Sequence, residues 1–482
     1  MNDIGIIGIG VMGQNLALNI ESKGFNVSVY DLNQEKVNDF ITLKAKGKNI
    51  EAFNTLNNFV NSLKPPRKIL MMVNAGKPVD DVINNLLEYV NEEVIIIDGG
   101  NSNFKDSIRR YNELESRKIR FIGMGVSGGE EGALKGPSLM PGGSFSAWEE
   151  VKEILTSISA KVGEGTPCCD YVGEDGAGHF VKMIHNGIEY GDMQLIAETY
   201  LIMKNLLGMD HQEMSDVFAK WNEGELESYL IEITSKILTK KDTDGFPLLE
   251  KILDTAGQKG TGRWTAITSL EVGVPLTLIT EAVYARNLSG LKEERIKASK
   301  LINEPEGSFD GDKVEFLKCL EKALYAAKII SYAQGYLLMR HASSEYNWKL
   351  NYGGIALIWR GGCIIRSKFL GKINDAFNNS PDLENLLLDP YFNQIINDSQ
   401  DCLRKVISEC VLKGIWIPAF SSALSYLDGF RSERLPANLI QAQRDYFGAH
   451  TYERIDEPRG KFFHANWNEE MNNIEGSKNA DA

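Results

Sequence analysis

The segment 178–190 carries polar residues whose types and spacing fit acid/base chemistry, namely Lys182, His185, Asn186 and Glu189. Positions i, i+3, i+4 and i+7 lie on one face of a helix, and a stripe that faces a core is normally apolar. A lysine and a carboxylate on such a face could serve as base and acid, provided that burial or neighbouring cations lower the lysine pKa well below about 10.4. The alternative is a solvated charged face. Gly187 and Gly191 argue against it, because a helical glycine costs about 1 kcal/mol and is better explained by close approach of a ligand or another element.

A glycine-rich turn at residues 8–13 is a second candidate site, consisting of Gly8, Ile9, Gly10, Val11, Met12 and Gly13. It follows an apolar run and opens a helical pattern, which is the context that dinucleotide binding requires. The first glycine permits a tight turn, the second admits a pyrophosphate, and the third lets helix and strand pack closely. The helix N-terminus would add amide donors. The alternative is a glycine-rich turn that binds nothing.

Asp31 lies 18 residues beyond Gly13, at the end of the next apolar run. A carboxylate there can accept hydrogen bonds from an adenosine ribose and would repel a 2′-phosphate. Leu32 and Asn33 follow and provide no arginine for such a phosphate. This favours NAD over NADP, unless Asp31 only caps a turn.

Further polar groups could bind an anionic substrate. Ser127, Gly128 and Gly129 follow one predicted strand and Asn101 ends another, so both could lie in the crevice at the carboxyl edge of a sheet. Ordinary turn chemistry is an equal alternative. The candidate cations are Lys259 in a glycine-spaced loop, Arg286, Arg444 and His450. Taken alone, each of these four residues is better explained as an ordinary surface residue.

The elements that must position these groups change type along the chain. Apolar runs at 4–9, 27–30, 69–73, 94–97 and 119–122 predict buried strands, and helical patterns at 14–23 and 79–89 lie between them. Such alternation indicates a parallel, doubly wound sheet. After residue 176 the patterns at 196–206, 225–238, 314–338 and 391–412 are helical. We therefore expect an α/β Rossmann-like dinucleotide-binding domain (1–176), a large all-α domain (177–434) and a C-terminal tail (435–482).

Composition excludes several classes of protein. The 482 residues include 52 Lys+Arg and 66 Asp+Glu, a net charge of −14, which argues against a nucleic-acid or anionic-membrane partner. No apolar stretch approaches the roughly 20 residues that span a bilayer, and the N-terminus lacks a signal-peptide pattern. Six cysteines are too few for a disulfide scaffold, and the adjacent Cys168 and Cys169 lack CxxC spacing, so we expect a cytoplasmic protein without a metal site.

Taken together, these segments resemble the decarboxylating 6-phosphogluconate dehydrogenase family over essentially the whole chain. The matching stretches are 8–16 (GIGVMGQNL), 97–102 (IDGGNS), 125–130 (GVSGGE), 136–143 (GPSLMPGG), 178–190 (GHFVKMIHNGIEY), 257–262 (GQKGTG) and 443–450 (QRDYFGAH). The resemblance implies oxidation and decarboxylation of 6-phospho-D-gluconate to D-ribulose 5-phosphate and CO2 in the pentose phosphate pathway. It also implies a homodimer in which the tail of each subunit reaches the partner's active site.

The resemblance also implies residue roles. Lys182 would take the C3 hydroxyl proton as hydride leaves for the nicotinamide, and Glu189 would protonate C1 of the enediol that remains after CO2 departs. The sugar-acid end would be bound by Asn101, Ser127, Gly128, Gly129, His185 and Asn186. The phosphate end would be bound by Tyr190, Lys259, Arg286, Arg444 and His450. The cofactor would contact the glycine-rich turn, Asp31, Leu32, Asn33, Val73, Asn74, Ala75 and Asn101.

The chain departs from the common family pattern at the cofactor. Many members have Asn-Arg-Ser/Thr where this chain has Asp31, Leu32 and Asn33, and many have lysine in place of Asn74. Gly10 is often alanine in members that use NADP. The family default is NADP, but these departures favour NAD. The competing hypotheses are a shorter β-hydroxyacid dehydrogenase of the 3-hydroxyisobutyrate type and a non-catalytic dinucleotide-binding protein. The long helical part and the Lys182–Glu189 pair count against them.

Overall fold

The structure is a computed structural model that describes residues 1–90, 94–305, 307–467 and 474–475. Its internal contacts divide the chain into two compact units, Met1–Leu424 and Ser425–Ala482, and each is described by itself. The three-part division of function along the sequence stays a prediction.

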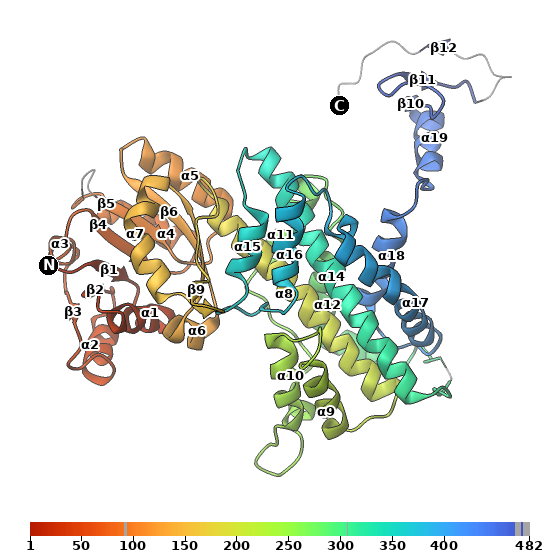
Figure 1. The fold of residues 1–482 in the computed structure, drawn as a ribbon, viewed down its shortest axis with the longest axis horizontal. Helices are drawn as coiled ribbons and strands as arrows, with labels where there is room; N and C mark the ends of the chain where they lie inside the picture. The colour runs from red at the N-terminus through yellow and green to blue at the C-terminus, as the bar shows by residue number, and fades with distance from the viewer. Residues whose placement is uncertain (91–93, 306, 468–473, 476–482) are drawn as a thin grey trace. The chain divides into compact units, whose positions relative to one another are not determined.

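The first unit begins with a seven-stranded sheet in the order β3-β2-β1-β4-β5-β6-β7 (Figure 1). Its strands are β1 (Ile4–Ile7), β2 (Val27–Tyr30), β3 (Ile50–Ala52), β4 (Arg67–Met71), β5 (Val94–Asp98), β6 (Arg120–Ser127) and β7 (Ser138–Gly143). All neighbours pair in parallel except β6 and β7, which are antiparallel. The predicted Rossmann-like fold is confirmed. The prediction missed β3, which has three residues, and the antiparallel edge strand β7, whose proline and glycines weaken the strand signal.

Helices cover both faces of this sheet. One face carries α1 (Val11–Ser22), α2 (Gln34–Leu43), α6 (Gly129–Lys135) and α7 (Phe145–Ile158), and the other carries α3 (Leu56–Asn61), α4 (Lys77–Leu86) and α5 (Phe104–Glu115). Along β5, Ile95 and Ile97 pack into the first core and Val94 and Ile96 into the second. A strand buried on both sides must be apolar throughout, which is why these strands are unbroken apolar runs in the sequence.

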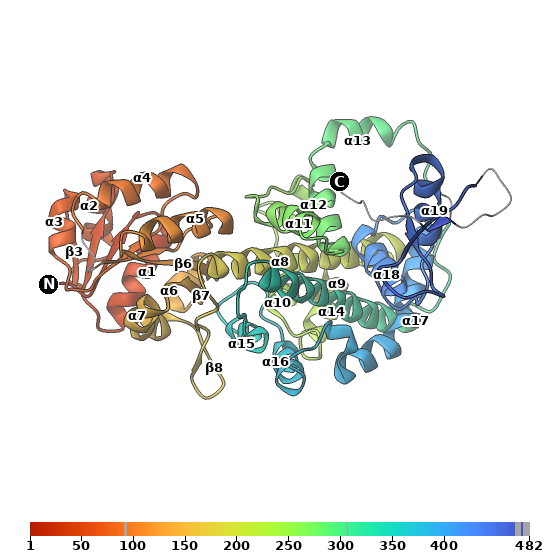
Figure 2. The ribbon, with the colours of Figure 1, turned by 90° about the horizontal axis from the view of Figure 1, so that it is seen from above.

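After the hairpin β8 (Lys161–Val162) and β9 (Thr166–Pro167), the first unit continues as helices. They are α8 (Ala177–Leu201) with its π-helical extension η1 (Ile202–Leu206), α9 (His211–Trp221), α10 (Tyr229–Thr239), η2 (Leu248–Lys251), α11 (Thr261–Glu271), α12 (Thr277–Ser289), α13 (Lys292–Ala298), α14 (Lys313–Glu345), α15 (Tyr352–Ile358), α16 (Leu370–Asn379), η3 (Leu386–Leu388) and α17 (Pro390–Leu412). The boundary between the two units, after Leu424, falls within α18 (Pro418–Phe430). Figures 1 and 2 show α8 running from beside the sheet into the helical part, with α14 alongside it. The predicted helical domain is confirmed.

Glycines let the start of α8 lie directly on the sheet. A Cβ atom on Gly178 would come within 2.0 Å of the carbonyl oxygen of Gly123 in β6. A Cβ atom on Gly125, also in β6, would come within 2.4 Å of the Lys182 Cβ. Because neither residue has a Cβ, the helix packs against the strand and Lys182 lies beside the carboxyl end of β6.

The second unit contains α19 (Ala437–Gly448) and a small antiparallel sheet of β10 (Tyr452–Glu453), β11 (Phe462–His464) and β12 (Ile474–Glu475). Its centre is the buried Asp445, which accepts hydrogen bonds from His464 Nδ1 at 2.8 Å and Trp467 Nε1 at 2.8 Å. Across the parts of the chain that the structure describes, no helix is both long enough and apolar enough to cross a bilayer.

Candidate active site

The polar stripe of α8 is buried. Lys182 is 7% exposed and His185 is fully buried, while the Glu189 side chain is 21% exposed and lies 3.8 Å from His185, measured from Oε2 to Nδ1. Burial lowers the pKa of Lys182, although Glu189 opposes this shift. Burial raises the pKa of Glu189, opposed by the charges of Lys182 and Arg286. A solvated charged face is therefore excluded, and both pKa values move in the direction that a basic lysine and an acidic glutamate need.

A chain of hydrogen bonds links this stripe to the carboxyl end of β6. His185 Nε2 lies 3.2 Å from Ser127 Oγ, and its Nδ1 lies 3.1 Å from Asn186 Oδ1. Burial and the nearby Lys182 lower the pKa of His185 well below its usual range, so the ring is neutral. A neutral ring facing an amide oxygen donates from Nδ1, so its Nε2 accepts from the Ser127 hydroxyl. Asn186 Nδ2 in turn donates to Thr261 Oγ1 at 2.9 Å, at the start of α11.

The two glycines in this part of α8 accommodate neighbouring helices. A Cβ atom on Gly187 would lie 2.6 Å from Thr265 Cγ2 of α11, and one on Gly191 would lie 2.5 Å from Ser331 Oγ of α14. Of the two explanations that the sequence left open, the structure therefore supports close approach of another element.

One turn further along α8, an aromatic ring and a cation are stacked. The guanidinium carbon of Arg286, on α12, lies 3.5 Å from the ring centroid of Tyr190. Arg286 Nη1 donates to the Gly257 carbonyl at 3.2 Å, which ties it to the loop that carries the exposed Lys259. A Cβ atom on Gly262 would come within 2.5 Å of the Tyr190 ring, so α11 approaches this ring as closely as a glycine permits. Two cations thus lie at one loop, which could bind an anion.

The loops after β5 and β6 lie at the same carboxyl edge of the sheet. Asn101 is exposed in the loop after β5, where His179 Nε2 of α8 lies 3.1 Å from the neighbouring Gly100 carbonyl oxygen. Gly128 has φ +117°, and a Cβ there would lie 2.5 Å from the Gly362 carbonyl oxygen, so this turn requires glycine. Gly129 then begins α6. The sheet edge therefore presents Asn101 and Ser127 on the same side, as we expected.

The glycine-rich turn has the geometry that a dinucleotide needs. Gly8 has φ +98°, and a Cβ on Gly13 would lie 1.9 Å from the Gly8 carbonyl oxygen, so close packing requires both glycines. A Cβ on Gly10 would have no neighbour within 4 Å in the described chain. The space beside the Gly10 backbone is therefore free for a ligand. No side chain among the described residues caps the N-terminus of α1, so its amides face outward beside Val11 and Met12.

Asp31 is fixed by the backbone. Ile9 N donates to its Oδ2 at 2.7 Å and Asn33 N donates to its Oδ1 at 2.9 Å. The turn-capping role that the sequence left open is therefore present, and each carboxylate oxygen keeps a free lone pair for a ribose hydroxyl. The Asn33 side chain accepts from Lys36 N at 3.1 Å and caps α2.

A cavity of about 220 Å³ opens beside Asp31. Four of its lining residues were predicted for the cofactor, namely Gly8, Asp31, Leu32 and Val73, whereas the exposed Asn74 and Ala75 lie outside the lining. The cavity is also lined by residues that the sequence did not indicate, namely Ile7, Tyr30, Leu56, Pro78, Asp81, Val82 and Asn85. The spacing of the last four along one face of α4 is a signal that could have indicated them. The turn, the uncapped helix and this cavity together fit a dinucleotide.

Arg444 and His450 belong to the second unit, where both are exposed. Arg444 Nη1 donates to Gln441 Oε1 at 3.0 Å, and Gln441 Nε2 donates to the His450 carbonyl at 3.1 Å. Their role at the site stays a prediction.

Comparison with known proteins gives consistent matches over the length of the chain. Residues 3–173 match the NAD-binding domain of 6-phosphogluconate dehydrogenase, and residues 178–467 match its C-terminal domain. Decarboxylating 6-phosphogluconate dehydrogenases from Cunninghamella elegans and Homo sapiens are each 58% identical, over 98% and 96% of both chains respectively. The structure of Plasmodium falciparum 6-phosphogluconate dehydrogenase, studied with NADP+ and with 6-phosphogluconate, matches with a TM-score of 0.93 and 48% identity, over 96% of this chain and 100% of that one.

Proposed function

This chain belongs to the 6-phosphogluconate dehydrogenase family, and on that premise we propose that it oxidises and decarboxylates 6-phospho-D-gluconate to D-ribulose 5-phosphate and CO2. The reaction reduces a nicotinamide dinucleotide and serves the pentose phosphate pathway. The observation that carries the proposal is the buried Lys182–Glu189 array, whose two pKa values shift in opposite directions.

Lys182 acts first, as a general base. Its neutral amine takes the proton of the C3 hydroxyl. When bound, the oxidised nicotinamide supplies the acceptor for the hydride that leaves C3. The product is a β-keto acid, in which the C3 ketone accepts the electron pair released as the carboxylate leaves as CO2. Lys182, now protonated, donates to that oxygen, and the protonated Glu189 then delivers a proton to C1 of the enediol.

Two groups of residues orient the substrate. Asn101, Ser127, Gly128, Gly129, His185 and Asn186 bind the sugar-acid end. The neutral His185 suits this role because it holds the Ser127 hydroxyl without adding a charge beside Lys182. Tyr190, Lys259 and Arg286 bind the phosphate, with Arg444 and His450 completing this end.

The cofactor preference is for NAD. The cavity beside Asp31 contains two carboxylates, Asp31 and Asp81, and among the described residues that line it none is lysine or arginine. A 2′-phosphate there would meet negative charge without a compensating cation, whereas a ribose hydroxyl could donate to Asp31.

The active protein is a homodimer that exchanges its tails. Large apolar side chains remain exposed in α19, including Leu439 (61%), Ile440 (59%) and Phe447 (74%). Apolar side chains of α11, α12 and the segment after α13 are also exposed, including Leu270, Tyr284 and Leu301. Exposed apolar groups of this kind mark interaction surfaces, and a partner subunit with the same surfaces would cover them.

Turnover with 6-phosphogluconate tests the proposal. Incubation with either dinucleotide should give reduced nicotinamide and CO2 in equal amounts. Reduction without CO2 would point to a β-hydroxyacid dehydrogenase, and cofactor binding without reduction would point to a non-catalytic protein. For the cofactor, we expect kcat/KM to be higher with NAD. An equal or higher value with NADP would contradict the preference.

A further inference from the structure

Arg110 of α5 is a fully buried cation that the proposed mechanism does not use. It is 1% exposed, and such a charge persists in a protein interior only when it is paired and hydrogen-bonded. Its guanidinium donates from Nε to Asp80 Oδ1 at 2.8 Å and from Nη2 to Asp80 Oδ2 at 3.1 Å. The two parallel hydrogen bonds make a bidentate pair with the Asp80 carboxylate, and the other N–H groups of the guanidinium remain available to bind other residues.

Those remaining donors contact two different loops. Nη2 also donates to the Gly76 carbonyl at 3.0 Å, where the loop 73–76 enters α4. Nη1 donates to Asp98 Oδ2 at 3.5 Å and to Ser102 Oγ at 3.4 Å, on either side of Asn101 in the loop after β5. Arg110 therefore connects a loop predicted to contact the cofactor with a loop predicted to contact both cofactor and substrate.

The strands alone do not fix these loops. The β4–β5 ladder ends at Met71 paired with Asp98, and the two loops continue beyond it. Asp98 shapes its own loop, because its carboxylate accepts from Gly100 N at 3.0 Å and from Ser102 Oγ at 2.6 Å. A Cβ on Gly100 would lie 3.0 Å from the Val73 carbonyl oxygen, so the two loops pack tightly where Arg110 ties them together.

We infer that Arg110 is a positioning residue, which holds the loops 73–76 and 98–102 at the spacing that places the nicotinamide against C3 of the substrate. The inference rests on the proposed function. Its physical basis is that hydride transfer depends steeply on geometry, so that a displacement of about 1 Å can lower a rate by about 10²-fold. Lysine could replace the charge of Arg110 but not the planar set of donors on its guanidinium. A single ammonium group cannot reach Asp80, Gly76 and Asp98 together.

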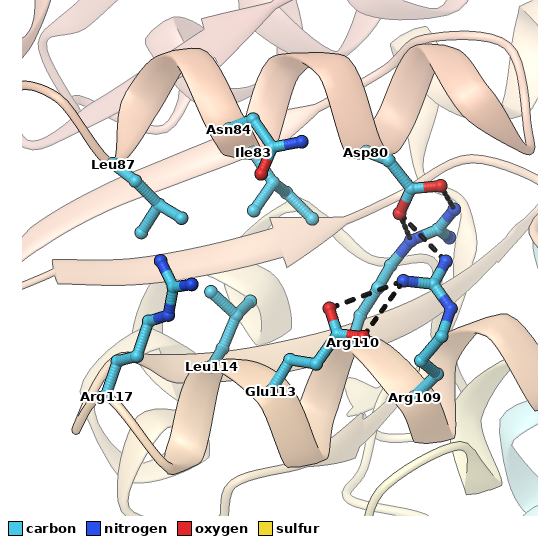
Figure 3. Close-up of a pocket in the computed structure, with 9 residues that line it drawn as sticks. All are labelled: Asp80, Ile83, Asn84, Leu87, Arg109, Arg110, Glu113, Leu114 and Arg117. Atoms are coloured by element: carbon cyan, nitrogen blue, oxygen red, sulfur yellow. Dashed lines mark hydrogen bonds and ion pairs between the residues drawn. The ribbon is translucent and has the colours of Figure 1, made fainter.

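The neighbouring Arg109 provides a matched control. Figure 3 shows both arginines converging on Asp80, with Arg109 Nη2 donating to Asp80 Oδ1 at 2.9 Å. Unlike Arg110, Arg109 is exposed, and its other described partners, Asp106 and Glu113, lie on α5 itself. A pocket of about 70 Å³ between α4 and α5 borders both residues (Figure 3).

The experiment compares Arg110→Lys with Arg109→Lys in the full-length protein. For Arg110→Lys we expect kcat to fall by about 10- to 100-fold, with a higher KM for 6-phosphogluconate and weaker binding of the dinucleotide in calorimetry. For Arg109→Lys these constants should stay within about twofold, because a half-exposed ion pair contributes little. Methylguanidinium added to Arg110→Ala should restore part of kcat, since it can occupy the vacated space beside the pocket.

Thermal unfolding separates positioning from stability. If Arg110→Lys melts at a lower temperature but keeps wild-type constants well below that temperature, the inference is wrong. Should Arg110→Lys fail to fold, Ser102→Ala replaces it, because it removes one Arg110 contact, together with the Ser102 bond to Asp98, without leaving a charge unpaired. It should lower kcat in the same direction, and wild-type kinetics would overturn the inference. An inactive wild type would contradict the proposed function instead, while the calorimetric comparison would still report on Arg110.

Discussion

At the scale of residues, burial on one face of α8 favours the protonation states that the proposed roles of Lys182 and Glu189 require. As the proposed base Lys182 must be neutral, and as the proposed acid Glu189 must be protonated. Burial disfavours the charged form of both groups, so it lowers the pKa of Lys182 and raises that of Glu189. Activity should decline at low pH, where Lys182 is protonated, and at high pH, where Glu189 is ionised. The two shifts therefore increase the fraction of molecules in which Lys182 is neutral and Glu189 is protonated at the same time.

Substitutions at these two residues test the assignment. Lys182→Met should abolish turnover while leaving dinucleotide binding intact, because the side chain keeps its volume and loses its amine. Glu189→Gln should lower kcat by about 10²- to 10⁴-fold and should lack the alkaline decline that the wild type shows. Both can be measured as kcat against pH, with binding by calorimetry. Normal turnover in Lys182→Met, or an unchanged alkaline decline in Glu189→Gln, would refute the corresponding role.

At the scale of elements, glycines set how closely the helices approach the site. Gly125 lets β6 lie against Lys182, Gly187 lets α11 lie against α8, and Gly262 lets α11 approach the Tyr190 ring. The last contact matters for binding, because Tyr190 is stacked on Arg286, a proposed phosphate ligand. The site is therefore held by contacts between backbones as well as by its functional side chains.

Gly262→Ala should consequently impair binding of the substrate. The new Cβ would lie 2.5 Å from the Tyr190 ring, so the ring must move and its stacking on Arg286 is disturbed. Overpacking of this kind costs about 1–3 kcal/mol, and we expect the KM for 6-phosphogluconate to rise more than kcat falls. Gly257→Ala is the control, since a Cβ there would meet nothing within 4 Å in the described chain. Equal effects of the two substitutions would contradict this explanation.

At the scale of the whole molecule, the exposed apolar side chains of α19 favour an exchanged tail. Of the residues described in that helix only Asp445 is buried, so the helix lacks a core of its own. A helix that leaves its apolar residues exposed is expected to bury them against a partner. Arg444, on the same helix, would then bind phosphate in the site of the other subunit.

Mixed dimers test this exchange. Lys182→Met and Arg444→Ala should each be inactive alone, the first for want of the base and the second for want of a phosphate ligand. If tails are exchanged, a mixed dimer contains one site with an intact Lys182 from one subunit and an intact Arg444 from the other. Random mixing should thus restore about a quarter of wild-type activity, since half of the dimers are mixed and each has one complete site. Absence of activity in isolated mixed dimers would show that each tail serves its own subunit.

Most strands of the sheet and the placement of Lys182 and Glu189 on one helix face could be predicted from the sequence, because both depend on patterns within single segments. Buried parallel strands are apolar throughout, so β1, β2, β4, β5 and β6 were predicted, whereas β7 contains a proline and glycines and was not. The spacing of Lys182 and Glu189 placed them on one helix face, since helical periodicity is a property of a single segment.

What only the tertiary structure decided concerns partners that lie far apart in the sequence. The sequence could not show that Lys182 is buried, that Gly187 faces Thr265, or that Arg110 reaches Asp80, Gly76 and Ser102. Burial and pairing arise when separate elements pack together, and no periodicity within one segment encodes which groups will meet. The sequence by itself thus determined the type of chemistry and its scaffold, while packing decided the burial of the Lys182–Glu189 pair and the spacing of the loops.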